Sequence, residues 1–154
     1  MKANIDSSKN TARIVGVLFI IGTVAGILSA FALGGLLNGP DYLDVVASNA
    51  SRVTVGAVLI LVMAIALAMI PALMFPILKK HSQPLAIGYV IFRGALETLT
   101  TIGLVVGWLL LVVVARQYVD SGATATSQFS SLGILLVKAN DPIMRSVVSI
   151  VFNL

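Results

Sequence analysis

Cysteine is absent from the chain, and histidine occurs once, as His81. Without cysteine there is no disulfide, no thiolate metal site and no cysteine nucleophile. A metal site needs several converging ligands, and neither a second histidine nor a carboxylate lies near His81 in the sequence. We therefore predict no metal and no cofactor, and we interpret His81 as a solvated or headgroup-facing residue.

The motifs of common enzyme classes are also missing. The sequence contains no glycine-rich phosphate loop, no nucleophile elbow and no HExxH pattern. We therefore predict no catalytic residues and a protein that is not an enzyme.

Charged residues are scarce, at 10% of the chain, whereas 58% of the residues are hydrophobic and the mean hydropathy is +1.06. An ordinary soluble domain is about 25% charged and about 45–50% apolar, so the composition predicts that lipid surrounds most of this chain. The net charge of +4 comes from bases scattered over short connections. We do not expect nucleic acid as a partner, because phosphate binding requires a clustered basic patch.

Three apolar stretches are long enough to cross a membrane, which takes about 20 helical residues. They predict transmembrane helices at about 14–37, 53–78 and 90–115, the last within an apolar run over 85–115. A signal peptide is the alternative for the first stretch, but the apolar run continues past the cleavage-like Ala30-Phe31-Ala32 to Leu37. The fold class is therefore all-α: a membrane-spanning helical bundle in a single integral membrane domain, 1–154.

The remaining segments are polar or short. The connection 41–52 has room for a turn or two of amphipathic helix, whereas 116–131 is predicted as a loop and 138–142 as a turn. The piece 129–137 is too short to span. A fourth helix begins at 143–154, and its twelve residues rise only about 18 Å. We expect an N-terminal fragment of a longer protein, with a half-inserted final helix as the alternative.

The bases predict the orientation. With three crossings, the N-terminal tail and the turn at Lys79-Lys80-His81 share one side of the membrane, and together they hold five Lys/Arg against four on the other side. Lys and Arg concentrate on the cytoplasmic side, so the N-terminus is predicted to be cytoplasmic.

Small residues recur at helical spacing and predict close helix packing. The first interpretation is a tightly packed bundle within one chain, and the alternative is a homodimer face on the first helix. Pro71 and Pro76 predict a kink in the second helix, either a bent helix end or a hinge for transport. The packing residues are Gly22, Gly26, Ala30, Gly34, Ala64, Ala68, Gly103 and Gly107.

Arg93 and Glu97 interrupt the third apolar run and are the candidate functional or structural ion pair. Their spacing of four places both on one face of a helix. If the span starts at Leu99, the pair lies in the inner headgroup zone, as a structural ion pair. If it starts at Leu85, Glu97 lies about 18 Å deep, near the midplane. There the pair would be a proton- or substrate-linked site, because ionisable groups in a membrane are costly.

The stretch "TARIVGVLFIIGTVAGILS" at 11–29 resembles the opening of a bacterial family of multi-pass membrane proteins, domain of unknown function 4386. "SRVTVGAVLILVMAIALAMIPALMFPILKKHSQPLAIGYVIFRGALETL" at 51–99 resembles its middle. The segment from Pro76 through His81 to Glu97 is the most specific part. The resemblance implies a bacterial inner-membrane protein and members longer than this chain, and it implies no activity, cofactor or catalytic residue.

Together these patterns favour a non-enzymatic helical component of the bacterial cytoplasmic membrane. A transporter or transport accessory that uses Arg93 and Glu97 is the alternative. The expected partners are the lipid bilayer and either further copies of the chain or other membrane helices.

Overall fold

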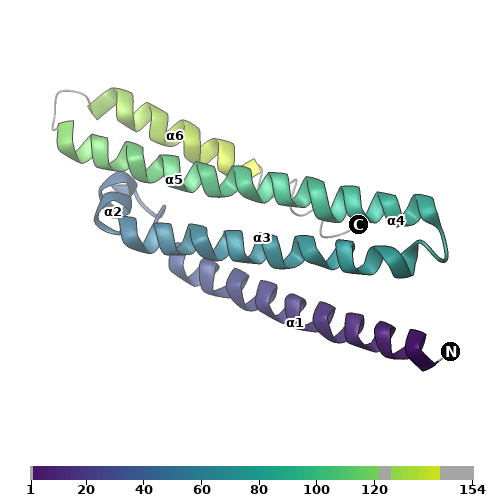
Figure 1. The fold of residues 1–154 in the computed structure, drawn as a ribbon. Helices are drawn as coiled ribbons and strands as arrows, with labels where there is room; N and C mark the ends of the chain where they lie inside the picture. The colour runs from purple at the N-terminus through teal and green to yellow at the C-terminus, as the bar shows by residue number, and fades with distance from the viewer. Residues whose placement is uncertain (1, 122–125, 143–154) are drawn as a thin grey trace.

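The computed structural model describes residues 2–121 and 126–142, and the side chains of 9–121 and 128–139. Within those ranges every regular element is helical (Figure 1), which confirms the all-α prediction. The elements are α1 (Lys2–Leu33), α2 (Tyr42–Ser48), α3 (Ala50–Leu78), α4 (Gln83–Tyr89), the π-helical η1 (Val90–Leu96), α5 (Glu97–Ser121) and α6 (Thr126–Pro142).

Three of these helical stretches are long and apolar enough to cross a membrane, which confirms the membrane-spanning prediction. They are Lys9–Leu33, Ala50–Leu78 and Gln83–Ser121, the last formed by α4, η1 and α5 in succession. Large apolar side chains cover their outward faces; Phe31 is 75% exposed and Ile20 is 64% exposed. Such surfaces suit lipid as the surrounding solvent.

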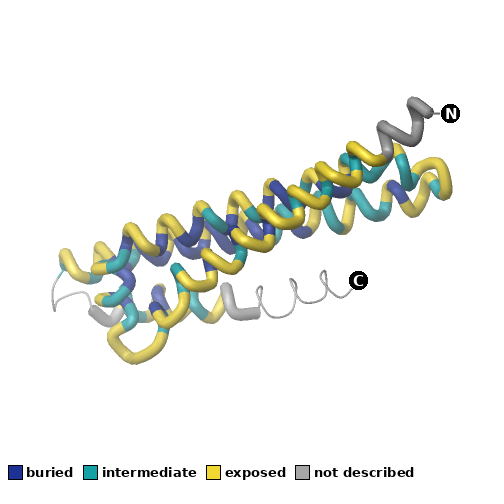
Figure 2. The backbone as a smooth tube through the Cα atoms, turned by 90° about the horizontal axis from the view of Figure 1, so that it is seen from below, coloured by how far each residue is buried: buried dark blue, intermediate teal, exposed yellow. Residues whose placement is uncertain are grey.

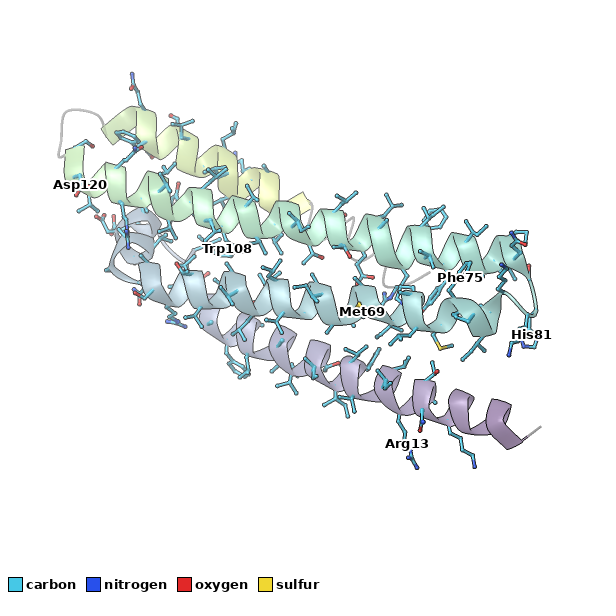
Figure 3. All side chains as sticks on the ribbon, viewed as in Figure 1. Arg13, Met69, Phe75, His81, Trp108 and Asp120 are labelled. Carbon is cyan, nitrogen blue, oxygen red and sulfur yellow. The ribbon has the colours of Figure 1, made fainter. Side chains whose placement is uncertain are left out.

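The helices lie side by side, with α3 in the centre (Figure 1). On one side α3 packs against α1, and on the other side it packs against α5, which runs back along it. The short α2 and the final α6 both pack against α5. Arg13 and His81 lie at one end of this arrangement, and Asp120 lies at the other (Figure 3).

We call these two ends the basic end and the α2 end. The basic end comprises residues 71–97, around the turn that holds Lys79 and Lys80. The α2 end comprises α2 with residues 50–60 and 104–121, where most of the core lies. Figure 2 shows the buried residues on the facing sides of the helices. The core there consists of Leu36, Leu43, Val46, Ala50, Val53, Ala57, Ile60, Leu104, Val105, Trp108, Leu111, Val112 and Ala115.

Some of the predicted small packing residues form the contact between α1 and α3. A Cβ added at Gly22 would lie 3.1 Å from Leu67, and one added at Gly26 would lie 2.8 Å from Met63 Sδ. Gly22 and Gly26 therefore pack within the chain, because α3 occupies the face of α1 on which a homodimer would form. On α3, Ala64 is buried and Ala68 is half-buried.

Other predicted packing residues point elsewhere. Ala30 is exposed, because a strict spacing of four advances about 400° and so rotates the stripe by about 40° at every step. Gly34 is also exposed, and it follows the end of α1 at Leu33. The buried face of α1 instead continues through Ala25 and Ser29. In α5, Gly107 is buried, but Gly103 is exposed and has no neighbouring atom within 4 Å of an added Cβ.

The first span ends earlier than predicted, at Leu33 rather than at residue 37. The chain turns there because Gly35 adopts φ +79°, a left-handed conformation that suits glycine. Arg52 at the start of α3 donates hydrogen bonds to the carbonyls of Phe31 (3.0 Å) and Gly34 (3.4 Å). These bonds satisfy carbonyls that the ending helix leaves free.

The predicted turn at 138–142 is wrong, and so is the predicted loop at 116–131 over the residues that the structure describes, 116–121 and 126–131. α5 continues to Ser121, and α6 covers Thr126–Pro142. Packing explains the second helix, because Gly133 of α6 lies against Tyr42 and Leu43 of α2 so closely that an added Cβ would collide. The short helix at 41–52 is present as α2. The predicted fourth helix at 143–154 lies outside the described residues.

A candidate polar site in the third span

Arg93 and Glu97 form an ion pair, with Arg93 Nη1 3.2 Å from Glu97 Oε2. The two side chains are 20% and 8% exposed, so both are largely withdrawn from the surface. Their elements differ: Arg93 belongs to η1, and Glu97 begins α5. The structure therefore brings together the two residues that the spacing of four predicts to be neighbours.

The contact is close enough for an ion pair but does not have the geometry of a hydrogen bond. Glu97 Oε2 is buried, and it has no hydrogen-bond partner among the described residues. A buried carboxylate oxygen without a hydrogen bond is costly. The pair is therefore a charged centre whose acceptor capacity is only partly used.

The backbone around Arg93 is π-helical from Val90 to Leu96. Short π segments inside α-helices are rare and occur frequently at functional sites. Gly94 lies in this segment and faces Pro71 of α3, because an added Cβ would be 3.4 Å from Pro71 Cγ. The wide turn of η1 thus meets the first proline of α3, so both helices are irregular at the same level.

The two prolines do not end α3, which continues through Pro71 and Pro76 to Leu78. Pro71 is one of the most fully buried of the described side chains. Its burial against η1 is a packing role, and the hinge hypothesis stays a prediction.

Threonines next to the pair bond to the backbone. Thr98, Thr100 and Thr101 each donate a hydroxyl hydrogen bond to the carbonyl four residues earlier, at Gly94, Leu96 and Glu97 respectively. Such bonds satisfy carbonyls and often bend helices. None of the three bonds supplies the carboxylate of Glu97 with a donor; Thr98 and Thr100 bond to carbonyls of the π segment, and Thr101 bonds to the first carbonyl of α5.

The facing helix α3 gives the depth of the pair. Pro71, which lies level with Gly94, precedes Lys79 by eight residues, about 12 Å along the helix. Glu97 lies three residues further from the basic end, which adds about 4.5 Å. Half of a hydrocarbon core of roughly 30 Å is about 15 Å. If the hydrocarbon core ends at Lys79, Glu97 lies about 17 Å deep, near the midplane; the choice between the two alternatives for Glu97 stays a prediction.

Two other polar features are simpler. His81 is exposed in the turn of the basic end, and the described residues contain no group of three or more potential metal ligands. At the α2 end, Asp44, Arg116 and Asp120 line an open groove of about 710 Å³ between α2 and α5. Sequence reasoning missed this groove, because the α2–α5 contact that forms it depends on the fold.

A comparison with sequence models of protein families identifies the family of the chain. The sequence model described as Domain of unknown function (DUF4386) matches residues 14–152. The chain belongs to this family. The match extends beyond the segments that carried the resemblance and includes α6, so the DUF4386 relationship covers all three spans and the candidate site. No curated protein and no solved structure matches the chain.

Proposed function

We propose that this DUF4386 protein is a non-enzymatic helical component of the bacterial cytoplasmic membrane, with its N-terminus in the cytoplasm. The ion pair within one helical turn is the main support, because Arg93 and Glu97 neutralise each other where α5 packs on α3. Each charge of the pair is compensated by the other within the chain, so the pair can serve the fold of a membrane protein without a ligand. The bases at the basic end support the orientation, since Lys79 and Lys80 lie in a short exposed turn.

A transporter or transport accessory is the second candidate. One observation favours it: Glu97 Oε2 is buried without a hydrogen-bond partner among the described residues, next to a π segment. An intramembrane carboxylate with unused acceptor capacity is suited to carry a proton or to bind a cation.

The variant Glu97→Gln separates the two candidates, because glutamine retains the size of the side chain but removes its charge and its titration. For a structural pair we expect normal insertion and lower thermal stability, with Arg93→Gln destabilising in the same way. The measurement is thermal unfolding in detergent, followed by the fluorescence of Trp108.

The transport candidate is tested by a growth or uptake phenotype that depends on protons. If Glu97→Gln folds with the stability of the wild type but abolishes such a phenotype, the structural interpretation fails and the transport candidate stands. Exposed Asp120→Asn, at the α2 end, is the matched control for removal of a carboxylate.

A further inference from the structure

The basic end holds an apolar groove that the charged pair does not use. It lies between α3 and the α4–η1 segment, with a volume of about 370 Å³. Its walls are the apolar side chains of Ala72, Phe75, Ile87, Val90 and Ile91. This volume lies in the range of about 300–1,000 Å³ that is typical of ligand sites in proteins.

The irregular helices explain why the groove exists. The wall on α3 lies between Pro71 and Pro76, where two backbone donors are missing. The opposite wall includes Val90 and Ile91 of the π-helical segment, whose turns are wider than those of an α-helix. Side chains from two such helices do not interdigitate as regular ridges and grooves do, so space is left between them.

A cation lies at the border of this groove. The ammonium of Lys79 lies 5.9 Å from the centre of the Phe75 ring, and Phe75 is one of the groove residues. This distance is within the range of a cation–π contact. Lys80 follows directly, and both lysines are exposed. The apolar groove is therefore bordered by the positive charge of Lys79, with Lys80 next to it in the chain.

We propose that this groove binds one anionic phospholipid of the cytoplasmic leaflet. An acyl chain fills the space between α3 and η1, and the phosphate of the headgroup contacts Lys79 and Lys80. Charge complementarity selects this occupant, because a helix of another protein would satisfy the apolar walls but not the paired lysines. The wall residues Ile87 and Ile91 are exposed, so the groove is open to lipid from the side.

The test is native mass spectrometry of the full chain, with added phosphatidylglycerol or phosphatidylcholine of the same acyl chains. We expect tighter binding of phosphatidylglycerol. Each lysine near an anionic headgroup raises the affinity for the anionic lipid roughly fivefold. The double variant Lys79→Gln/Lys80→Gln is therefore expected to reduce the preference for phosphatidylglycerol roughly 25-fold. Ala72→Phe, which fills the groove, is expected to weaken the binding of both lipids.

The matched control is Lys9→Gln/Arg13→Gln, which removes two charges from α1 and leaves the groove unchanged. We expect it to keep the preference for phosphatidylglycerol. Equal binding of both lipids to the wild type would overturn the proposal, as would an equal loss in the control, which would indicate diffuse attraction. A chain dimer that excludes lipid would assign the groove to a second copy. If Ala72→Phe fails to fold, Ile87→Trp fills the groove from its exposed side.

Discussion

The two ends of this helical layer are built differently. At the α2 end, regular α3 and α5 enclose Trp108, Leu111 and Val53 with little exposure, and α2 closes the core. At the basic end, the same two spans meet through Pro71 and a π-helical turn, with a charged pair and an open groove. The same pair of helices is therefore closely packed at the α2 end, whereas at the basic end it holds an ion pair and an open groove.

The largest expected effect tests the charged pair of the basic end. Removing one partner of a buried pair leaves an uncompensated charge and costs about 3–5 kcal/mol, whereas replacing both with apolar residues is often neutral. We therefore expect Glu97→Leu to destabilise strongly and Arg93→Leu/Glu97→Leu to recover most of the loss. Thermal unfolding of the two variants and the wild type measures this. Equal destabilisation by the single and double variants would show that the two charges do not act as a pair.

A slightly smaller effect is expected in the packed core of the α2 end. Leu111 is 1% exposed, so Leu111→Ala creates a cavity and is expected to cost about 2–4 kcal/mol. Leu110→Ala, on the exposed face next to it, is the control. The equivalent truncation at the basic end, Ile91→Ala, is expected to cost less than about 1 kcal/mol, since Ile91 is 48% exposed. Similar losses of stability in Ile91→Ala and Leu111→Ala would show that the two ends are packed equally well.

Two glycine substitutions distinguish a glycine that another helix contacts closely from one that no neighbouring atom approaches. A Cβ at Gly56 would lie 2.6 Å from Leu33 Cγ, whereas one at Gly103 would meet no atom within 4 Å. We expect Gly56→Ala to cost about 1–3 kcal/mol through overpacking. Gly103→Ala is expected to be neutral or stabilising, because alanine favours helix by about 1 kcal/mol over glycine. Melting temperatures of the two variants test this, and a destabilising Gly103→Ala would restore the predicted packing role of Gly103.

These glycines illustrate what the sequence could predict. The spans follow from hydropathy, and the Arg93–Glu97 contact follows from local helical spacing, so both were predictable. The exposed Gly103 and the π segment were not, because they depend on which face meets α3 and on the position of Pro71 opposite Gly94. Helix α6 was missed for the same reason, since its contact with Tyr42 is non-local and its sequence is rich in serine and weakly apolar.

The smallest expected effect concerns Tyr42 at the α2 end. Burial raises the pKa of its hydroxyl, and this hydroxyl has no hydrogen-bond partner among the described residues. Because the folded pKa is higher, folding favours the neutral form, and the associated stability is lost as the pH rises above about 10. Tyr42→Phe is expected to be neutral or stabilising by up to about 1 kcal/mol and to unfold less readily at alkaline pH. Unfolding midpoints at pH 8 and pH 11 test this, and a strongly destabilising Tyr42→Phe would reveal a partner for the hydroxyl.

We propose that the pair of Arg93 and Glu97 lies within the apolar length of the helices and not at the headgroups. Because the chain has no cysteine, single cysteines along 85–103 can be probed in native membranes with a membrane-impermeant maleimide. We expect labelling at position 85 near the basic turn, and protection at positions 93, 94, 97 and 101. Ready labelling at position 93 from the side of Lys79 and Lys80 would instead place the pair at the headgroups.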